Sequence, residues 1–208
     1  MRKKGNIGIM VLFVFLLVAG AIFALRVQSP QNTQSPQGSQ PLVQLPKITT
    51  MNEETDVHHP DGTRKLIMRT KRSPDGSRLY SFFTADIDGN NEQLIFEKTM
   101  SSDNPTTMAL PYNAWSPGTE KYVFIEETNA TGASYLVLNT SGKLFPNQEH
   151  HLDVTALFKE KKIPYTFQNA TGWASPTLLI FRTTTDTGAK GPSYWFEVPS
   201  LAFLQLAR

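Results

Sequence analysis

The chain has 208 residues, of which 39% are hydrophobic and 18% charged, the proportions of an ordinary folded protein rather than a disordered one. Its formal net charge is +2, and removing Arg2, Lys3 and Lys4 from the 20 basic residues leaves 17 against 18 acidic ones, so the chain lacks the concentrated basic surface of a nucleic-acid-binding protein. The absence of cysteine excludes disulfides, thiolate catalysis, cysteine metal ligands and a lipid-modified cysteine anchor.

The N-terminal region predicts a single membrane helix. An uncharged apolar run extends from Ile7 to Leu25, long enough for a helix of about 28 Å in a hydrocarbon core of about 30 Å. We expect a short basic N-terminus (1–6) in the cytoplasm and a signal anchor at 7–26. The domain that follows would then lie outside the cytoplasm, on the far side of the plasma (inner) membrane.

A cleaved signal peptide is the alternative for this region, because Ala19-Gly20-Ala21 fits a cleavage pattern of small residues. We favour the uncleaved anchor, since the apolar run continues beyond that point to Leu25. Both alternatives export the remainder of the chain.

A linker is predicted at 27–47. The unit Gln-Ser-Pro-Gln occurs at Gln28–Gln31 and again at Gln34–Gln37, and apolar residues are nearly absent before Leu42. Such a segment buries too little surface to offset the entropy cost of ordering it, so we expect a disordered tether.

Residues 48–208 predict an all-β domain. Short runs of β-branched and aromatic residues alternate with Gly, Pro, Asn and Asp, as is typical of strands joined by turns. These runs are Lys65–Arg69, Leu79–Thr84, Gln93–Phe96, Tyr122–Glu126, Tyr135–Leu138, Leu178–Phe181, Tyr194–Val198 and Leu201–Leu206. One helix is expected at Val154–Lys162, with Asp153 as its N-cap and Pro164 beyond its end.

The predicted strands recur in three units. The turn prolines Pro60, Pro117 and Pro176 are 57 and 59 residues apart. A tyrosine opens a later strand of each unit, and a turn and a final strand follow. The tyrosines are Tyr80, Tyr135 and Tyr194, and the final strands are expected to contain Phe96, Phe145 and Phe203. Four antiparallel strands per unit are typical of a β-propeller blade.

The recurring turns resemble those of the TolB-like β-propeller repeat, over residues 57–208. The matching segments are Ser73-Pro74-Asp75-Gly76, Trp115-Ser116-Pro117-Gly118 and Asp86-Ile87-Asp88-Gly89. Two departures are that His58-His59 replaces Trp-Ser in the first unit and that the turn Asp is missing from the second and third. The resemblance implies propeller-like blades. Hydrolases with TolB-like propellers keep their catalytic triad in a separate α/β domain. No segment of this sequence is predicted to form such a domain, so the resemblance also implies a non-catalytic chain.

Only three blades are expected, whereas closed propellers have about 4–8. The chain would therefore form an open stack of blades, complete a ring by self-association (for example, two chains making six blades), or be a truncated descendant of a longer propeller. Open blades leave edge strands that need cover, which favours a homo-oligomer.

Histidines and acidic residues are the candidate metal ligands. The histidines occur as two pairs, His58-His59 and His150-His151. Adjacent residues of a strand point to opposite faces, so each pair would offer at most one good ligand, and we expect surface or packing roles. Five residues, Asp86, Asp88, Asn90, Glu92 and Glu97, are spaced loosely like a calcium loop, but the required glycine is misplaced. We predict no metal, cofactor or catalytic residue.

Three further features have a structural and a functional interpretation. Trp115 and Trp173 would form a ligand platform or, as we expect from their matched positions, pack between blades. The run Lys159–Lys162 is expected to be a solvated helix face rather than a lipid or partner site. Asn129, Asn139 and Asn169 match the N-glycosylation pattern, which matters only in a eukaryotic secretory pathway.

The sequence therefore predicts a membrane-tethered, extracytoplasmic module that binds a protein or an envelope component. Two alternatives remain: a hydrolase or glycan-active enzyme with a site built from the repeat loops, and a structural subunit of an envelope assembly. The residues that would bind the partner are not predicted.

Overall fold

The computed structural model describes residues 52–103 and 105–206, which belong to one compact unit, Lys47–Arg208. The predicted N-terminus (1–6), membrane helix (7–26) and linker (27–47) lie outside the described residues. Within the described part of the chain, no helix is long and apolar enough to cross a membrane.

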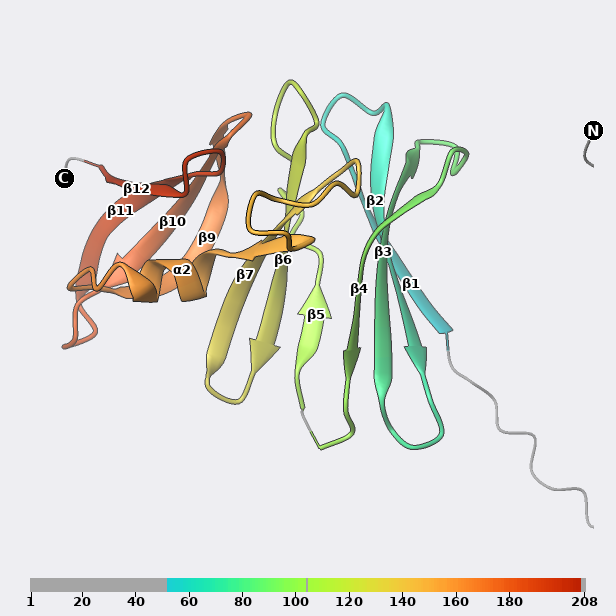
Figure 1. Ribbon diagram of the computed structural model, residues 1–208, viewed down its shortest axis with the longest axis horizontal. Coiled ribbons are helices and arrows are strands. Elements are labelled where there is room, and N and C mark those ends of the chain that lie inside the picture. Colours follow the sequence, from blue (N-terminus) through green and yellow to red (C-terminus); the bar gives the residue numbers. More distant parts are fainter. Residues whose placement is uncertain (1–51, 104, 207–208) are drawn as a thin grey trace, which may run out of the picture. The chain divides into compact units, whose positions relative to one another are not determined.

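Twelve strands and one helix make up the described residues, which confirms the all-β class (Figure 1). The strands are β1 (Asn52–His58), β2 (Arg64–Arg72), β3 (Arg78–Asp86), β4 (Gln93–Met100), β5 (Thr107–Ala109), β6 (Tyr122–Asn129), β7 (Gly132–Asn139), β8 (His151–Asp153), β9 (Thr166–Ser175), β10 (Leu178–Thr184), β11 (Lys190–Glu197) and β12 (Ala202–Gln205). The helix, α2, spans Val154–Glu160.

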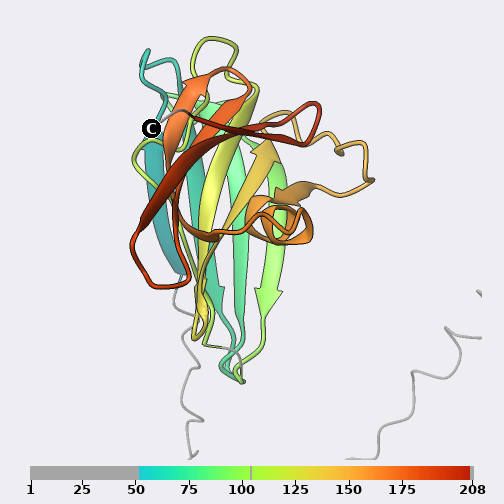
Figure 2. The ribbon, with the colours of Figure 1, turned by 90° about the vertical axis from the view of Figure 1, so that its left-hand side faces the viewer.

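The strands form three four-stranded antiparallel sheets, each built from four consecutive strands that pair with their sequence neighbours. The first sheet contains β1–β4, the second β5–β8 and the third β9–β12. Figure 1 shows the three sheets in succession, and in Figure 2 the third sheet, coloured orange and red, lies in front of the other two.

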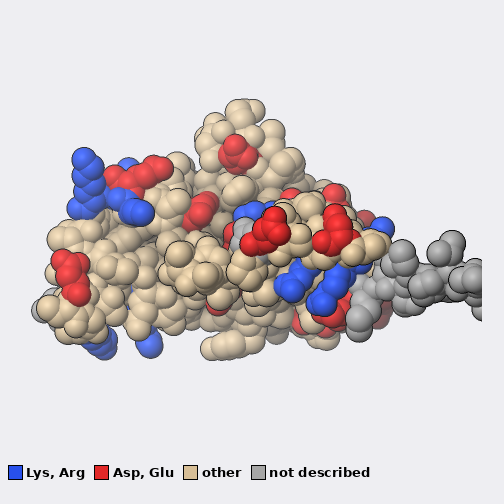
Figure 3. All heavy atoms as spheres, turned by 90° about the horizontal axis from the view of Figure 1, so that it is seen from below, with Lys and Arg blue, Asp and Glu red and all other residues tan. Residues whose placement is uncertain are grey.

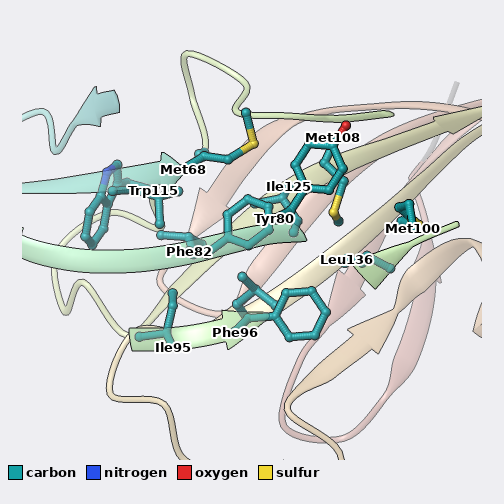
Figure 4. Packing of buried hydrophobic residues seen from close by; sticks show 14 residues of the cluster. Met68, Tyr80, Phe82, Ile95, Phe96, Met100, Met108, Trp115, Ile125 and Leu136 are labelled. Carbon is teal, nitrogen blue, oxygen red and sulfur yellow. The ribbon is translucent and has the colours of Figure 1, made fainter. Parts of the chain in front are cut away.

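One hydrophobic core lies between the first and second sheets. Phe82 of β3 and Phe96 of β4 lie close to Ile125 and Leu136 of the second sheet in this core, and Tyr80 joins them (Figure 4). Burial of side chains of this size stabilises the fold by about 1.5–3 kcal/mol each. The ion pair between Lys98 Nζ and Glu127 Oε2, 2.5 Å apart, joins the same two sheets.

A second core, largely aromatic, lies between the second and third sheets. Residues of β6 and β7 that alternate with those of the first core, among them Phe124 and Val137, pack here against Phe181 and Phe196. Phe158 of α2 lies at its centre, with rings of four aromatic residues within 6.0 Å (Phe167, Phe181, Tyr194 and Phe203). The second sheet is therefore covered on both faces, because alternate strand residues point to opposite sides.

Helix α2 begins as predicted. The Asp153 carboxylate accepts a hydrogen bond from Ala156 N at 2.9 Å, so Asp153 is the N-cap. The helix ends at Glu160, two residues earlier than expected, because Lys162 has a left-handed φ of 51°.

The fourth strand of the second unit differs from the prediction. Phe145 lies outside the strands and is buried in the second core, while the fourth strand is the short β8 at His151–Asp153. The segment before β8 contains Pro146, which has no N–H for a ladder, and Gly142 and Gln148 adopt left-handed φ values. A turn therefore occupies the place where the strand was expected.

The repeated tyrosines lie in the third strand of each sheet, as expected, but they do not all face the same way. Tyr80 points toward the second sheet and Tyr135 toward the third, whereas Tyr194 points back toward the second. A shift of one residue is enough for this reversal, since strand side chains alternate with a period of two. In the third sheet, Trp195 takes the outward direction.

Candidate functional site

The two matched tryptophans pack between sheets, which confirms the structural interpretation. Trp115 is buried, and its indole Nε1–H donates to the Val57 carbonyl of the first sheet at 3.0 Å. Trp173 donates in the same way to the Ala114 carbonyl at 2.9 Å. Each indole therefore satisfies a backbone carbonyl of the preceding unit, and neither ring offers a free ligand platform.

The first histidine pair is split between surface and interior, as the alternation of strand side chains predicts. The side chain of His58 is 59% exposed, and that of His59 is 5% exposed. The His59 ring packs edge-to-face on Trp115, with 5.3 Å between ring centroids. His59 of the first unit thus packs in the contact between the first and second sheets.

His59, Asp61 and Glu120 form the one group of potential metal ligands in the described residues, with ligand atoms within 4.8 Å of one another. Asp61 Oδ1 lies 2.7 Å from His59 Nδ1 and accepts hydrogen bonds from the backbone N–H and hydroxyl of Thr63. The Thr63 hydroxyl and N–H, with His59, lower the pKa of Asp61. Glu120 lies 3.5 Å from Arg64.

The contacts of this cluster stabilise the turn after β1 and connect it to the second sheet. Asp75 makes the same pair of bonds to Ser77 in the next turn, with no histidine beside it, so the Asp61 arrangement is the turn's own. The Thr63 hydroxyl also donates to Glu120 at 3.1 Å, which links the turn to the second sheet. The sequence offered no signal for Glu120, because its approach depends on how the sheets stack.

The second histidine pair lies at the junction of β4 and β8. His150 is exposed, whereas the ring of His151 packs on Phe96 with centroids 5.2 Å apart. Burial, reinforced by the charge of Lys98, lowers the pKa of His151. The neutral form of His151 is therefore the one that suits this position.

The residues with calcium-like spacing do not converge. Asp86 accepts from the Asn91 amide at 2.6 Å in the β3–β4 turn. Glu92 pairs with Arg69 at 2.6 Å, and Glu97 accepts from Ser81, both on the outer face of the first sheet. These acidic groups serve a hairpin turn and a strand surface.

The three glycosylation-pattern asparagines and the lysine run lie at the surface or in turns. Asn129 and Asn139 each accept two bonds from the hydroxyl residue two positions later, which closes a turn. Asn169 lies in β9, and Lys159 lies in the last turn of α2, beside a cleft.

That cleft, of about 780 Å³, lies between the second and third sheets and is the principal candidate binding site. Its walls come from the β6–β7 hairpin, from α2 with the residues after it, and from the start of β9. The lining residues are Asn129, Thr131, Gly132, Ala133, Ser134, Thr155, Phe158, Lys159, Ile163, Tyr165, Thr166, Phe167, Gln168 and Thr184.

The cleft is rich in hydroxyl and amide groups, with an aromatic floor. Lys159 supplies its single formal charge among these lining residues. One wall is β9, the terminal strand of the third sheet, and Thr166–Gln168 of that strand line the cleft. Further along, Asn113 donates to the Thr171 carbonyl at 2.7 Å and so covers part of the same edge. The arrangement suits an extended, polar and largely uncharged ligand.

No sequence pattern pointed to this cleft, because its walls come from segments that lie up to 55 residues apart, from Asn129 to Thr184. A comparison of the chain with models of protein families finds none that matches. No curated protein matches the sequence either.

Proposed function

We propose that this chain is a membrane-tethered, extracytoplasmic binding module of the TolB-like propeller kind, without catalytic activity, that recognises a protein of the cell envelope. The apolar run at Ile7–Leu25 and the basic residues before it support the tether and its orientation. Three consecutive four-stranded sheets joined by matched tryptophans support blades of the propeller kind.

The cleft beside β9 carries the binding proposal. An exposed strand edge supplies backbone donors and acceptors in a row, and an extended peptide that adds to such an edge gains main-chain hydrogen bonds. Ser134, Thr155 and Gln168 supply polar side chains for the peptide, and Phe167 supplies an apolar surface. The occupant is therefore an extended, mainly uncharged segment of a partner protein.

Photo-cross-linking in the native membrane tests the cleft. A benzophenone amino acid replaces the exposed Gln168 in the full-length chain, and the control places it at Thr99, an exposed residue of β4. We expect a discrete adduct from Gln168 and none from Thr99. The adduct should weaken when Ser134→Trp fills the cleft.

Equal adducts from both positions, or none from Gln168, would contradict the cleft as a binding site. The Ser134→Trp result is interpreted only if this variant has the same melting temperature as the parent.

A separate experiment tests the orientation of the domain relative to the membrane. Tyr112, which is 87% exposed, is replaced by cysteine in this cysteine-free chain. A membrane-impermeant maleimide should label it in intact cells, and labelling only after lysis would refute the extracytoplasmic location.

A structural subunit of a larger assembly is the second candidate, and one observation favours it. Leu204 of β12 is 48% exposed on the outer face of the third sheet. It lies beside Trp195 in the strand register, at the end of the sheet stack.

A further inference from the structure

The two end sheets of the stack have different outer faces. On the first sheet, Arg69 lies 2.7 Å from Glu54 and 2.6 Å from Glu92, and its guanidinium covers the Phe83 ring at 4.7 Å. Lys65 and Asp56 form a further pair, 3.8 Å apart, on the same face. Charged side chains therefore surround and partly cover the apolar side chains of this face, which include Leu79 and Phe83. Terminal units of repeat proteins generally carry such a polar outer face.

The middle of the third sheet's outer face is apolar. Ile180 pairs with Trp195 and Trp195 with Leu204, so these three side chains form one row across β10, β11 and β12. Leu178 lies two residues from Ile180 on the same side. None of the four belongs to either core cluster. We refer to these four residues as the third-sheet patch.

The third-sheet patch resembles the faces that the other two sheets bury against a neighbouring sheet. In each sheet, the third strand carries a large aromatic ring on the face directed along the stack: Tyr80, Tyr135 and Trp195. The second sheet buries Tyr80, and the third sheet buries Tyr135. Trp195, by contrast, is partly exposed at the end of the stack.

We propose that two copies of this chain associate face to face through the third-sheet patch, around a two-fold axis. A two-chain ring or a head-to-tail filament would instead place the apolar patch on the first sheet's outer face. That contact would remove the Arg69–Glu54 and Lys65–Asp56 pairs from water and place an apolar surface over them, which is costly. Pairing two third sheets buries apolar surface against apolar surface. This proposal does not depend on the cleft.

Charges at the rim of the patch fit the two-fold arrangement. Arg182 lies at one end of the patch, and Glu197 lies at the other end on the adjacent strand. A two-fold axis along the Ile180–Trp195–Leu204 row places each residue of the row over its own counterpart. It also places Arg182 of one copy opposite Glu197 of the other, with a lateral offset of about one strand spacing, ~4.8 Å, so that the long side chains can meet across the gap between the sheets. The surface is therefore complementary to itself.

The size of the face sets the strength of the association. Four strands at about 4.8 Å spacing and about 20 Å long give a projected area of roughly 400 Å² per copy. Stable interfaces bury about 800 Å² per partner, so a reversible dimer is expected. A covalent trap is the suitable measurement for such a complex.

Single-cysteine cross-linking tests the proposal, because the chain has no cysteine of its own. Leu204→Cys lies on the proposed axis, and the control, Lys71→Cys, lies on the outer face of the first sheet. A short bis-maleimide cross-linker, which bridges the ~10 Å between two sheets packed face to face, should give a covalent dimer of the full-length protein in detergent from Leu204→Cys and not from Lys71→Cys. A cross-link that forms only when the two variants are mixed would establish head-to-tail stacking, and no cross-link at all would refute a dimer. Either result overturns the proposal.

Exchanging the charges of Arg182 and Glu197 distinguishes the proposed interface from non-specific hydrophobic association. Arg182→Glu is an exposed substitution that places two acidic groups together, and we expect it to lower the cross-linked yield of Leu204→Cys roughly fivefold. Adding Glu197→Arg should restore the yield. A yield that Arg182→Glu leaves unchanged, or that the exchange does not restore, contradicts the proposed geometry.

Discussion

Individual residues join the three sheets through side-chain bonds to backbone carbonyls. The indole of Trp115 reaches Val57, the indole of Trp173 reaches Ala114, and the Thr84 hydroxyl donates to the Thr140 carbonyl at 3.1 Å. Such carbonyls lie at or near the sheet contacts, where an unpaired acceptor is costly. The sheet contacts are consequently specified by polar bonds as well as by apolar packing.

Trp115→Phe should destabilise the fold by about 1–3 kcal/mol, because it leaves the Val57 carbonyl without its donor. Chemical denaturation of the full-length chain in detergent measures this loss. Trp195→Phe is the control, since that ring lies on the outer face, and it should cost less than half as much. Equal stability of Trp115→Phe and the parent would show that the indole bond does not contribute.

The lowered pKa of His151 makes stability depend on pH. The unfolded histidine has a pKa of about 6.5, whereas the folded one titrates lower. The unfolded state therefore binds the proton first, so stability is complete above pH ~6.5 and falls as the pH drops toward the folded pKa.

His151→Phe should remove this dependence while keeping a ring against Phe96. Denaturation midpoints at several pH values between about 5 and 8 provide the measurement. The parent should lose more stability than the variant over this range. Parallel curves for the two proteins would contradict the assignment to His151.

At the scale of the element, turn residues and strand composition made most of the fold predictable. All eight predicted apolar runs fall in or overlap strands, and Asp153 caps the helix as expected. These features were accessible because β-propensity, turn formation and capping depend on neighbouring residues. The fourth strand of the second unit was not predictable in this way, because the short β8 depends on pairing with β7.

Two strand glycines with similar backbone conformations offer an element-scale prediction. Gly132 has φ +136°, and a Cβ added there would meet nothing within 4 Å, whereas a Cβ at Gly172 of β9 would lie 2.8 Å from Asn113 Nδ2. Gly132→Ala should cost about 1–3 kcal/mol through backbone strain alone.

Gly172→Ala should cost about 1–3 kcal/mol more than Gly132→Ala, because it also displaces the Asn113 amide from the Thr171 carbonyl. Urea denaturation of the two variants gives the difference directly. If Gly132→Ala proved the more damaging, the close approach of Asn113 to β9 would not be a constraint on the sheet contact.

At the scale of the whole described domain, the second sheet is shared by both cores. Its strands β6 and β7 bury alternate residues on opposite faces, while the first and third sheets each pack on one side only. Figure 3 shows acidic and basic side chains close together over the end of the domain where the first sheet lies, and further charged side chains at the opposite end. The stack therefore has a protected centre and two exposed ends.

Amide hydrogen exchange should be slowest in the central sheet and faster in the two end sheets. Backbone amides in the central parts of β6 and β7 should exchange most slowly, because opening the second sheet exposes both cores. Mass spectrometry of peptides from the full-length chain measures the rates. Slower exchange in β2 and β3 of the first sheet than in β6 and β7 would contradict a centrally stabilised stack.

Local sequence was enough to locate eight of the twelve described strands and to show that three similar units follow one another, because these properties depend on residues within one turn or strand. The stacking of the sheets decided which face each strand presents: Tyr194 points back along the stack, and its neighbour Trp195 points out. Stacking also decided that Glu120 meets His59 and that a cleft opens beside β9. The first outcome depends on a shift of one residue along the strand, which moves a side chain to the opposite face of the sheet. The other two depend on contacts between segments that are distant in the sequence. No local sequence pattern predicts either.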